Sequence, residues 1–197
     1  MADARRVVLA TMNEHKVIEL NRILAEAGTE AEIVGLGEFP GAPDVRETGL
    51  TFADNALLKA REIAAYTGLP AVADDSGLTV NALNGMPGIL SARWAGRHGD
   101  DRANLELLLR QLADIDRRGA AFVCVAALAQ PDGGGERTAT GVLPGRVTRE
   151  PRGANGFGYD PIFVPDGMAV TTAELTPAEK DAISHRGRAF RAIARYL

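Results

Sequence analysis

Short apolar runs alternate with amphipathic segments along the first half of the chain, and this pattern is typical of an α/β fold. Apolar runs of strand length occupy four segments, at 6–10, 31–35, 71–73 and 78–83. Apolar residues at helical spacing occupy three others, at 16–27, 51–67 and 100–112. Thr51 and Asp54 have the spacing of a capping box, which predicts that the second of these helices begins after Thr51.

The second half of the chain begins with two long strand-like segments, at 120–129 and 137–147. The turn sequence PDGGGE lies between them, so we expect a β-hairpin. A short strand at 161–164, a helix beginning at Thr176-Pro177 and a terminal helix over 184–197 complete the pattern. Strands that alternate with helices and are followed by a hairpin predict an α/β fold with a mixed sheet.

Composition narrows the class of protein further. With 197 residues, 46% of them hydrophobic, the chain suits a single domain over 1–197. A net charge of -4 provides no positive field for nucleic acid, so no nucleic-acid partner is expected. No apolar stretch approaches the ~18 residues of a membrane span, so no membrane partner is expected either. The single cysteine, Cys124, lies in an apolar run and fits a reducing, cytoplasmic location.

A polar turn follows the first predicted strand and precedes the first predicted helix. Such a turn presents free backbone N–H groups and the positive end of the helix dipole, both of which suit an anion. The pattern predicts either a phosphate site or an ordinary capped turn, and the glycine pattern of a P-loop is absent. The residues of this turn are Thr11, Met12, Asn13, Glu14, His15 and Lys16.

Two adjacent acids, Asp74 and Asp75, follow the buried run at 71–73. Unpaired buried carboxylates are costly, so we expect a divalent cation or a lysine beside them. Carboxylates without neighbouring His or Cys favour Mg²⁺ over Zn²⁺. The alternative is that the sequence DDSG forms an Asx turn that closes a hairpin at Gly77.

Glu47 lies in a Pro/Gly-rich loop, and Asn55 and Lys59 follow it on one face of the next predicted helix. Their spacing alone favours a solvated polar stripe. A glycine-rich segment at 151–160 holds Phe157 and Tyr159, and aromatic rings between glycines are suited to stacking on a base. His185 and Arg186 lie next to a later helix start, where His185 is either part of a site or a surface residue.

Together these clusters favour an enzyme that acts on a magnesium-bound nucleotide. Lysine usage adds to this interpretation, because the only lysines among 22 basic residues are Lys16, Lys59 and Lys180, and each falls in or beside one cluster. Codon bias toward arginine is one explanation. The other explanation is that these three positions need a compact ammonium and do not fit a guanidinium.

The motifs that carry this chemistry resemble a known family. T-x-N-x-x-K-x-x-E begins at Thr11, and it is followed in order by ETGLTFADNALLKA, ADDSGLTVNAL, PGILSARWAG, GFGYDPIF and SHRGRA. These blocks span nearly the whole chain and are similar to those of the inosine triphosphate pyrophosphatases of the Ham1/RdgB type. Met12 stands where the family commonly has glycine, a departure that removes no reactive group.

The resemblance implies hydrolysis of ITP, dITP and XTP to the nucleoside monophosphate and pyrophosphate, which removes deaminated purines from the nucleotide pool. It implies a Mg²⁺ cofactor and a homodimer. It also implies an elongated central mixed sheet flanked by helices, with two lobes and an active-site cleft between them.

The resemblance also implies roles for individual residues. Glu47 and Asp75 would hold the metal with help from Asp74. Asp75 is also the implied acceptor of the water proton, and its roles as ligand and base both stay open. Lys59 would compensate the carboxylates or touch a phosphate. Thr11, Asn13 and Lys16 would hold the triphosphate. The other implied substrate contacts are Ser76, Phe157, Gly158, Tyr159, Asp160, Lys180, His185 and Arg186, with Phe157 stacked on the purine.

Two other functions are compatible with the pattern. One is a pyrophosphatase of the Maf type that acts on modified pyrimidine nucleotides, and the SHR and FGYD blocks argue against it. The other is a sensor that binds nucleotides without hydrolysing them, although the retained carboxylates favour turnover. Release of pyrophosphate from purine and pyrimidine triphosphates discriminates among the three.

Overall fold

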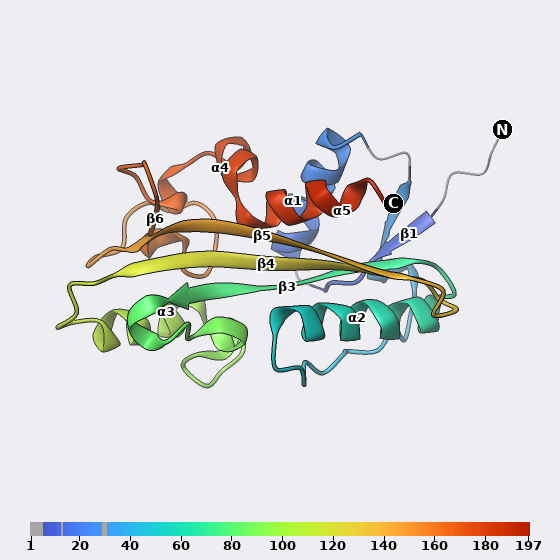
Figure 1. Ribbon diagram of the computed structural model, residues 1–197, viewed down its shortest axis with the longest axis horizontal. Coiled ribbons are helices and arrows are strands. Elements are labelled where there is room, and N and C mark those ends of the chain that lie inside the picture. The colour runs from blue at the N-terminus through green and yellow to red at the C-terminus, as the bar shows by residue number, and fades with distance from the viewer. Residues whose placement is uncertain (1–5, 13, 29–30) are drawn as a thin grey trace. The chain divides into compact units, whose positions relative to one another are not determined.

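The computed structural model describes residues 6–12, 14–28 and 31–197. In this part of the chain six strands form one sheet, in the order β2-β1-β3-β4-β5-β6 (Figure 1). The strands are β1 (Arg6–Leu9), β2 (Glu32–Gly35), β3 (Ala71–Val80), β4 (Gly119–Ala129), β5 (Glu136–Val147) and β6 (Phe163–Pro165). The helices are α1 (Glu14–Glu26), α2 (Phe52–Thr67), α3 (Asp101–Gln111), α4 (Pro177–Ile183) and α5 (His185–Ala194).

The sheet contains both strand orientations. β1 pairs in parallel with β2 and with β3, whereas β5 and β6 are antiparallel. The α/β fold with a mixed sheet and flanking helices is therefore confirmed, and β4 and β5 are neighbours as the hairpin prediction requires. In the described ranges, none of the helices has both the length and the apolar character required to span a bilayer.

The chain divides into two compact units. Unit 1 comprises Met1–Asp75, Cys124–Gly141 and Arg186–Leu197, and unit 2 comprises Ser76–Val123 and Val142–His185. Residues of β3, β4 and β5 contribute to both units, because each of these strands continues past a division.

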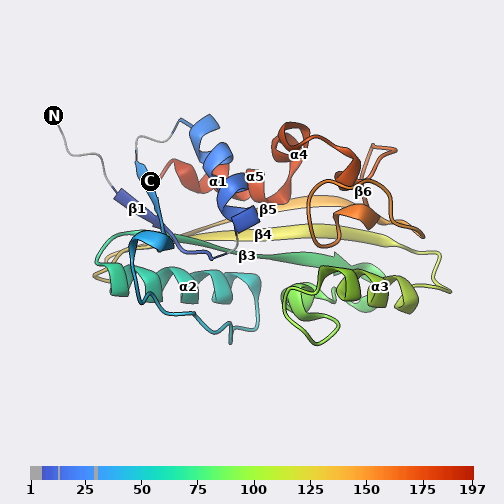
Figure 2. The same ribbon diagram turned by 180° about the vertical axis from the view of Figure 1, so that it is seen from behind.

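Unit 1 has helices on both faces of its strands, with α1 and α5 on one face and α2 on the other (Figures 1 and 2). Alternate residues of β1 and β3 supply the two cores. Leu9 and Val72 pack with side chains of α1 and α5, whereas Val8 and Ala73 pack with side chains of α2. This period of two is the geometry of a strand that is buried on both faces.

Unit 2 has its own apolar core beneath α3. Leu105, Leu108 and Leu112 on the inner side of this helix pack with Leu78 of β3 and Phe122 of β4. The helix begins at the position that the sequence predicts, because the side chain of Asp100 caps it by accepting a hydrogen bond from the Ala103 N–H at 3.1 Å.

The predicted helix starts at Thr51 and Thr176 are also confirmed. Thr51 and Asp54 form a reciprocal capping box at α2, and Thr176 caps α4 with Pro177 in its first turn. The left-handed Gly68, with a φ of 69°, ends α2.

The alternative that DDSG forms an Asx turn is excluded. β3 runs without a break from Ala71 to Val80, so Asp74, Asp75 and Ser76 lie within a strand and not in a loop. Its predicted continuation to Leu83 is also wrong, because a 3₁₀ turn, Asn81–Leu83, follows the strand. The sequence did not predict the 3₁₀ helix Gly88–Arg93, which places Ser91 against β3.

Gly77 supplies a test of how the strand packs. A Cβ on Gly77 would meet the Gly88 carbonyl and the Ser91 hydroxyl, whereas a Cβ on Gly37 would meet open space. We therefore expect Gly77→Ala to lower the free energy of unfolding by about 1–3 kcal/mol, because overpacking forces the neighbouring backbone to move. Urea denaturation measures the change. Gly37→Ala is the control, and an equal effect of both variants would contradict this packing.

Candidate active site

Asp74 projects to the side of β3 that α1 and α5 cover. Nζ of Lys16, in α1, donates to both carboxylate oxygens, at 3.0 and 3.2 Å, and Nε of Arg186, in α5, lies 3.5 Å from Oδ2. Burial by itself would raise the pKa of Asp74, but Lys16, Arg186 and Lys59 hold that pKa below its ordinary value. Asp74 is therefore a permanently charged anchor for two cations.

Arg186 carries the ionic network to a second carboxylate. Its Nη1 donates to Oε2 of Glu19, in α1, at 2.5 Å, and both side chains are buried. Burial opposes the charge on Arg186, yet Glu19 and Asp74 raise its pKa above the ordinary value. The guanidinium thus ties α5 to α1 and to β3.

Asp75 projects to the opposite side of β3, toward α2. Oδ2 of this carboxylate accepts a hydrogen bond from Asn55 Nδ2 at 2.9 Å. Burial raises the pKa of Asp75 to about 6, and the nearby charge of Glu47 adds to this effect, while Lys59 and Asn55 oppose it. This pKa places the charge change of Asp75 about two pH units above that of an ordinary aspartate.

Glu47 comes to the same side from the loop that precedes α2. Lys59 Nζ donates to Glu47 Oε1 at 2.6 Å. Burial would lower the pKa of Lys59, but Asp74, Glu47 and Asp75 raise it above its ordinary value. Lys59 thus faces acidic groups, so its predicted place in a solvated polar stripe is wrong.

The carboxylates of Glu47 and Asp75 fit a hard divalent cation. Within the described residues no group of three or more His, Cys, Asp or Glu side chains is arranged to hold a metal ion. Mg²⁺ at nucleotide sites commonly uses only one or two carboxylates and completes its shell with water and phosphate oxygens. Burial, and to a smaller extent the charge of Glu47, raises the pKa of Asp75, and a cation beside both carboxylates would offset both effects.

The predicted phosphate turn is described only in part. The Thr11 N–H donates to the Leu9 carbonyl at 2.9 Å, and the Met12 side chain is 75% exposed. Asn13 lies outside the described residues, and for Glu14 and His15 only the helical backbone is described. From this turn the structure brings Lys16 to Asp74.

Unit 2 holds a second polar cluster, centred on the buried Asp160. Its Oδ2 accepts hydrogen bonds from Lys180 Nζ at 2.6 Å and from the Phe157 N–H at 2.9 Å, and its Oδ1 accepts one from the Thr172 hydroxyl at 2.8 Å. Lys180 Nζ lies 5.1 Å from the centroid of the Phe157 ring. Gly156 has a φ of 75°, and the Asp160 carboxylate lies where a Cβ at this position would be.

Other predicted residues of unit 2 serve its packing. The Tyr159 hydroxyl donates to the Ser91 carbonyl at 2.9 Å, and the Gly158 N–H donates to Asp101 at 2.9 Å. Of the two interpretations of His185, that of a surface residue is excluded, because the side chain is buried and stacks on Phe122 at 4.8 Å between ring centroids. Ser76 is half-buried in β3.

Arg186 does not lie with the residues that the sequence grouped it with. The motif grouped it with Lys180 and His185, but its guanidinium lies in unit 1 on Asp74 and Glu19. Sequence reasoning noted Glu19 and Asn55 but assigned neither of them a role in the site. Glu19 was visible as the last residue of the first motif, and Asn55 as a polar residue one helical turn before Lys59.

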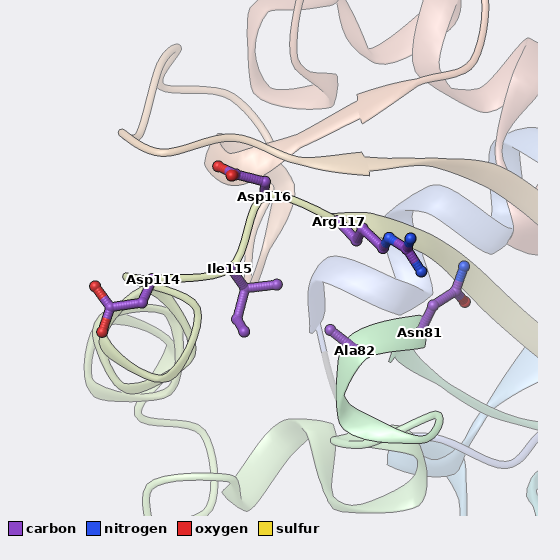
Figure 3. Close-up of a pocket in the computed structure, with 6 residues that line it drawn as sticks. All are labelled: Asn81, Ala82, Asp114, Ile115, Asp116 and Arg117. Atoms are coloured by element: carbon purple, nitrogen blue, oxygen red, sulfur yellow. The ribbon is translucent and has the colours of Figure 1, made fainter.

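A separate pocket of about 460 Å³ lies in unit 2 (Figure 3). It contains none of the residues that the sequence predicts for the site. Its lining residues are Asn81, Ala82, Asp114, Ile115, Asp116 and Arg117. Asp116 is also held by an ion pair with Arg149 at 2.5 Å.

The profile of the Ham1 family matches residues 7–196. The chain belongs to the Ham1 family. It is 62% identical to a dITP/XTP pyrophosphatase from Streptomyces coelicolor, over 95% of this chain and 94% of that protein. A HAM1 protein structure from Coxiella burnetii, 44% identical, has a TM-score of 0.88 and covers 98% of both chains.

A crystal structure of a nucleoside-triphosphatase / dITP/XTP pyrophosphatase from Mycobacterium abscessus is 56% identical to this Ham1 chain. Its TM-score is 0.78, and the match covers 98% of this chain and 97% of that one. The family that the sequence motifs predict is therefore confirmed.

The raised pKa of Asp75 predicts how stability depends on pH in the metal-free protein. A carboxyl whose pKa is about 6 in the fold, above its unfolded value, contributes stability that is complete below the unfolded pKa and is lost as pH rises through about 6. We expect the unfolding free energy of the wild type to fall by about 2–3 kcal/mol relative to Asp75→Asn between pH 4 and pH 8. Denaturation in the presence of a chelator measures this, and a difference that is constant with pH would contradict it.

Proposed function

We propose that the chain hydrolyses non-standard purine nucleoside triphosphates, namely ITP, dITP and XTP, to the nucleoside monophosphate and pyrophosphate. The enzyme class follows from membership of the Ham1 family, and relatives named dITP/XTP pyrophosphatase support the substrate class. The observation that carries the proposal to this chain is the cluster in unit 1, where Lys16 donates to Asp74 at 3.0 Å and Lys59 donates to Glu47 at 2.6 Å.

The cluster of unit 1 supplies the groups for the triphosphate and the metal. Glu47 and Asp75 would hold Mg²⁺. Asp74 is already bonded to Lys16 and lies beside Arg186, so its part is to hold these cations in place. When bound, Mg²⁺ would neutralise phosphate charge and lower the pKa of a water molecule. Lys16 and Lys59 counter the negative charge that develops on the phosphates.

Asp75 is the candidate for accepting the proton of the attacking water. A general base is most effective when its pKa lies near the working pH, and the raised pKa of Asp75 brings it closer to neutrality than an ordinary aspartate. A base and a metal ligand both require the ionised carboxylate, so either role depends on the same charge state. No covalent intermediate is required. Cys124 is also poorly suited to form one, because it is buried and its burial raises the pKa of its thiol.

The cluster of unit 2 supplies the groups for the purine. Phe157 would stack on the base, and the Lys180 ammonium beside its ring would donate to the 6-oxo group. The 6-amino group of ATP is itself a donor, so it would leave one polar group unpaired at a cost of roughly 1–3 kcal/mol. The Asp160 carboxylate holds both Lys180 and the backbone of Phe157, which keeps these two groups together.

Two further parts of the proposal rest on the sequence. A homodimer is proposed from the resemblance of the motifs to the family. A cytoplasmic location is proposed from the single cysteine, which suits a reducing compartment and the place where nucleotide pools are kept.

A substrate panel tests the proposal. With Mg²⁺ present, we expect pyrophosphate release from ITP and XTP with kcat/KM about tenfold or more above that for ATP. Asp75→Asn, which is nearly isosteric, should reduce kcat by about 100-fold or more while it keeps the fold. A higher kcat/KM for a pyrimidine triphosphate, or binding of ITP without pyrophosphate release, would contradict the proposal.

Lys16→Arg tests whether the site needs a compact ammonium. Arginine preserves the charge, but its guanidinium is larger than an ammonium and would share Asp74 with the guanidinium of Arg186, so we expect kcat/KM for ITP to fall about tenfold. Arg61→Lys, in an exposed ion pair with Glu136, is the matched control and should leave kcat/KM unchanged. Wild-type kinetics in Lys16→Arg would show that the site does not distinguish the two cations.

A further inference from the structure

Asn55 contacts Asp75 but has no role in the chemistry proposed above. It lies in the first turn of α2, its side chain is fully buried, and it makes two hydrogen bonds in opposite directions. Its Oδ1 accepts from the Gly49 N–H at 2.8 Å, and its Nδ2 donates to Asp75 Oδ2 at 2.9 Å. One amide therefore connects the loop that carries Glu47 with the strand that carries Asp75.

The chemistry of the partners fixes the orientation of this amide. A backbone N–H can only donate, so it must face the amide oxygen, and this leaves the NH₂ group for the carboxylate. A carboxylate can only accept, an alkyl side chain does neither, and a hydroxyl would have to make both hydrogen bonds from one oxygen atom, whereas the amide has a separate acceptor and donor. The amide thus matches both partners at once.

Gly49 is shaped to accept this contact. A Cβ on Gly49 would lie 2.5 Å from Asp54 Cβ, 2.7 Å from Asn55 Oδ1 and 2.9 Å from the Asn55 N atom. The loop backbone can approach the amide only because position 49 has no side chain. Since Glu47 lies two residues before Gly49, this contact limits where the Glu47 carboxylate can be.

We infer that Asn55 is a positioning residue that sets the spacing between the Glu47 and Asp75 carboxylates and so prepares them to bind one divalent cation. The inference rests on the proposed function only in its choice of metal and substrate. Residues that orient metal ligands through hydrogen bonds typically change metal affinity or activity by about 10–100-fold when they are replaced.

The chain contains a matched control for this residue. Asn104 is buried and occupies the same place in α3, the fourth residue of the helix, as Asn55 does in α2. It also holds the preceding loop, because Oδ1 accepts from the Ala95 N–H at 2.7 Å and Nδ2 donates to the Ala92 carbonyl at 3.1 Å. Its second partner is a backbone carbonyl, so it holds a loop without touching a site carboxylate.

The first experiment measures the Mg²⁺ concentration that gives half-maximal pyrophosphate release from ITP. We expect Asn55→Ala to raise this concentration about tenfold or more, and Gly49→Ala, which pushes the loop away from an intact Asn55, to raise it in the same direction. Asn104→Ala should leave it within about twofold, because loss of a purely structural contact lowers the amount of folded protein and not its demand for metal.

The second experiment has no need of turnover. Electron paramagnetic resonance of Mn²⁺ added to the nucleotide-free protein should show about tenfold weaker binding to Asn55→Ala than to the wild type and to Asn104→Ala. Hydrogen exchange in the metal-free protein should show that the Gly49 amide loses protection in Asn55→Ala and keeps it in Asn104→Ala.

The inference is overturned if Asn55→Ala and Gly49→Ala keep the wild-type demand for Mg²⁺ and the wild-type affinity for Mn²⁺. If Asn55→Ala does not fold, Gly49→Ala decides the question by the same two measurements. If the wild type releases no pyrophosphate from any purine triphosphate, the proposed function fails, and Mn²⁺ binding alone then decides the role of Asn55.

Discussion

A β-strand directs successive side chains to opposite faces, and in β3 this alternation separates two adjacent buried carboxylates. Asp74 lies among the cations of α1 and α5, whereas Asp75 meets Asn55 of α2 and lies near Glu47. Lys16 and Lys59 act on both carboxylates, but the hydrogen-bond partners of the two differ, and their pKa values move in opposite directions. Asp74 becomes a fixed charge that organises helices, and Asp75 becomes a group that gains or loses a proton near neutral pH.

The three lysines of the chain share one arrangement. Lys16, Lys59 and Lys180 each donate to a carboxylate, those of Asp74, Glu47 and Asp160, at 3.0, 2.6 and 2.6 Å. These lysines are also candidates for binding phosphate or base. The ion pair with a carboxylate holds each ammonium in place before a ligand binds. Such preorganisation lowers the cost of ordering these long side chains on binding. The rarity of lysine in the sequence thus coincides with its use in these pairs.

Much of the fold could be predicted from local patterns. The helix starts at Thr51 and Thr176 follow from capping chemistry, and the mixed sheet follows from alternating apolar runs. The unbroken β3 could not be predicted in this way, because DDSG has the composition of a turn and becomes a strand only when Lys16, Arg186 and Asn55, distant in sequence, compensate its charges. The place of Arg186 was missed for the same reason: its partner Glu19 is 167 residues away. The motifs identified the family. The cluster in which each residue lies depends on ion pairs and hydrogen bonds between residues that are distant in the sequence.

The central claim is that one strand gives two neighbouring aspartates opposite electrostatic surroundings. The most direct measurement is the titration of their carboxyl carbons by ¹³C nuclear magnetic resonance in the metal-free protein. The account predicts that Asp75 titrates near pH 6, and that Asp74 stays ionised below the ordinary aspartate value of about 3.9. Two carboxyls that titrate together in the ordinary range, or an Asp74 that titrates above Asp75, would contradict it.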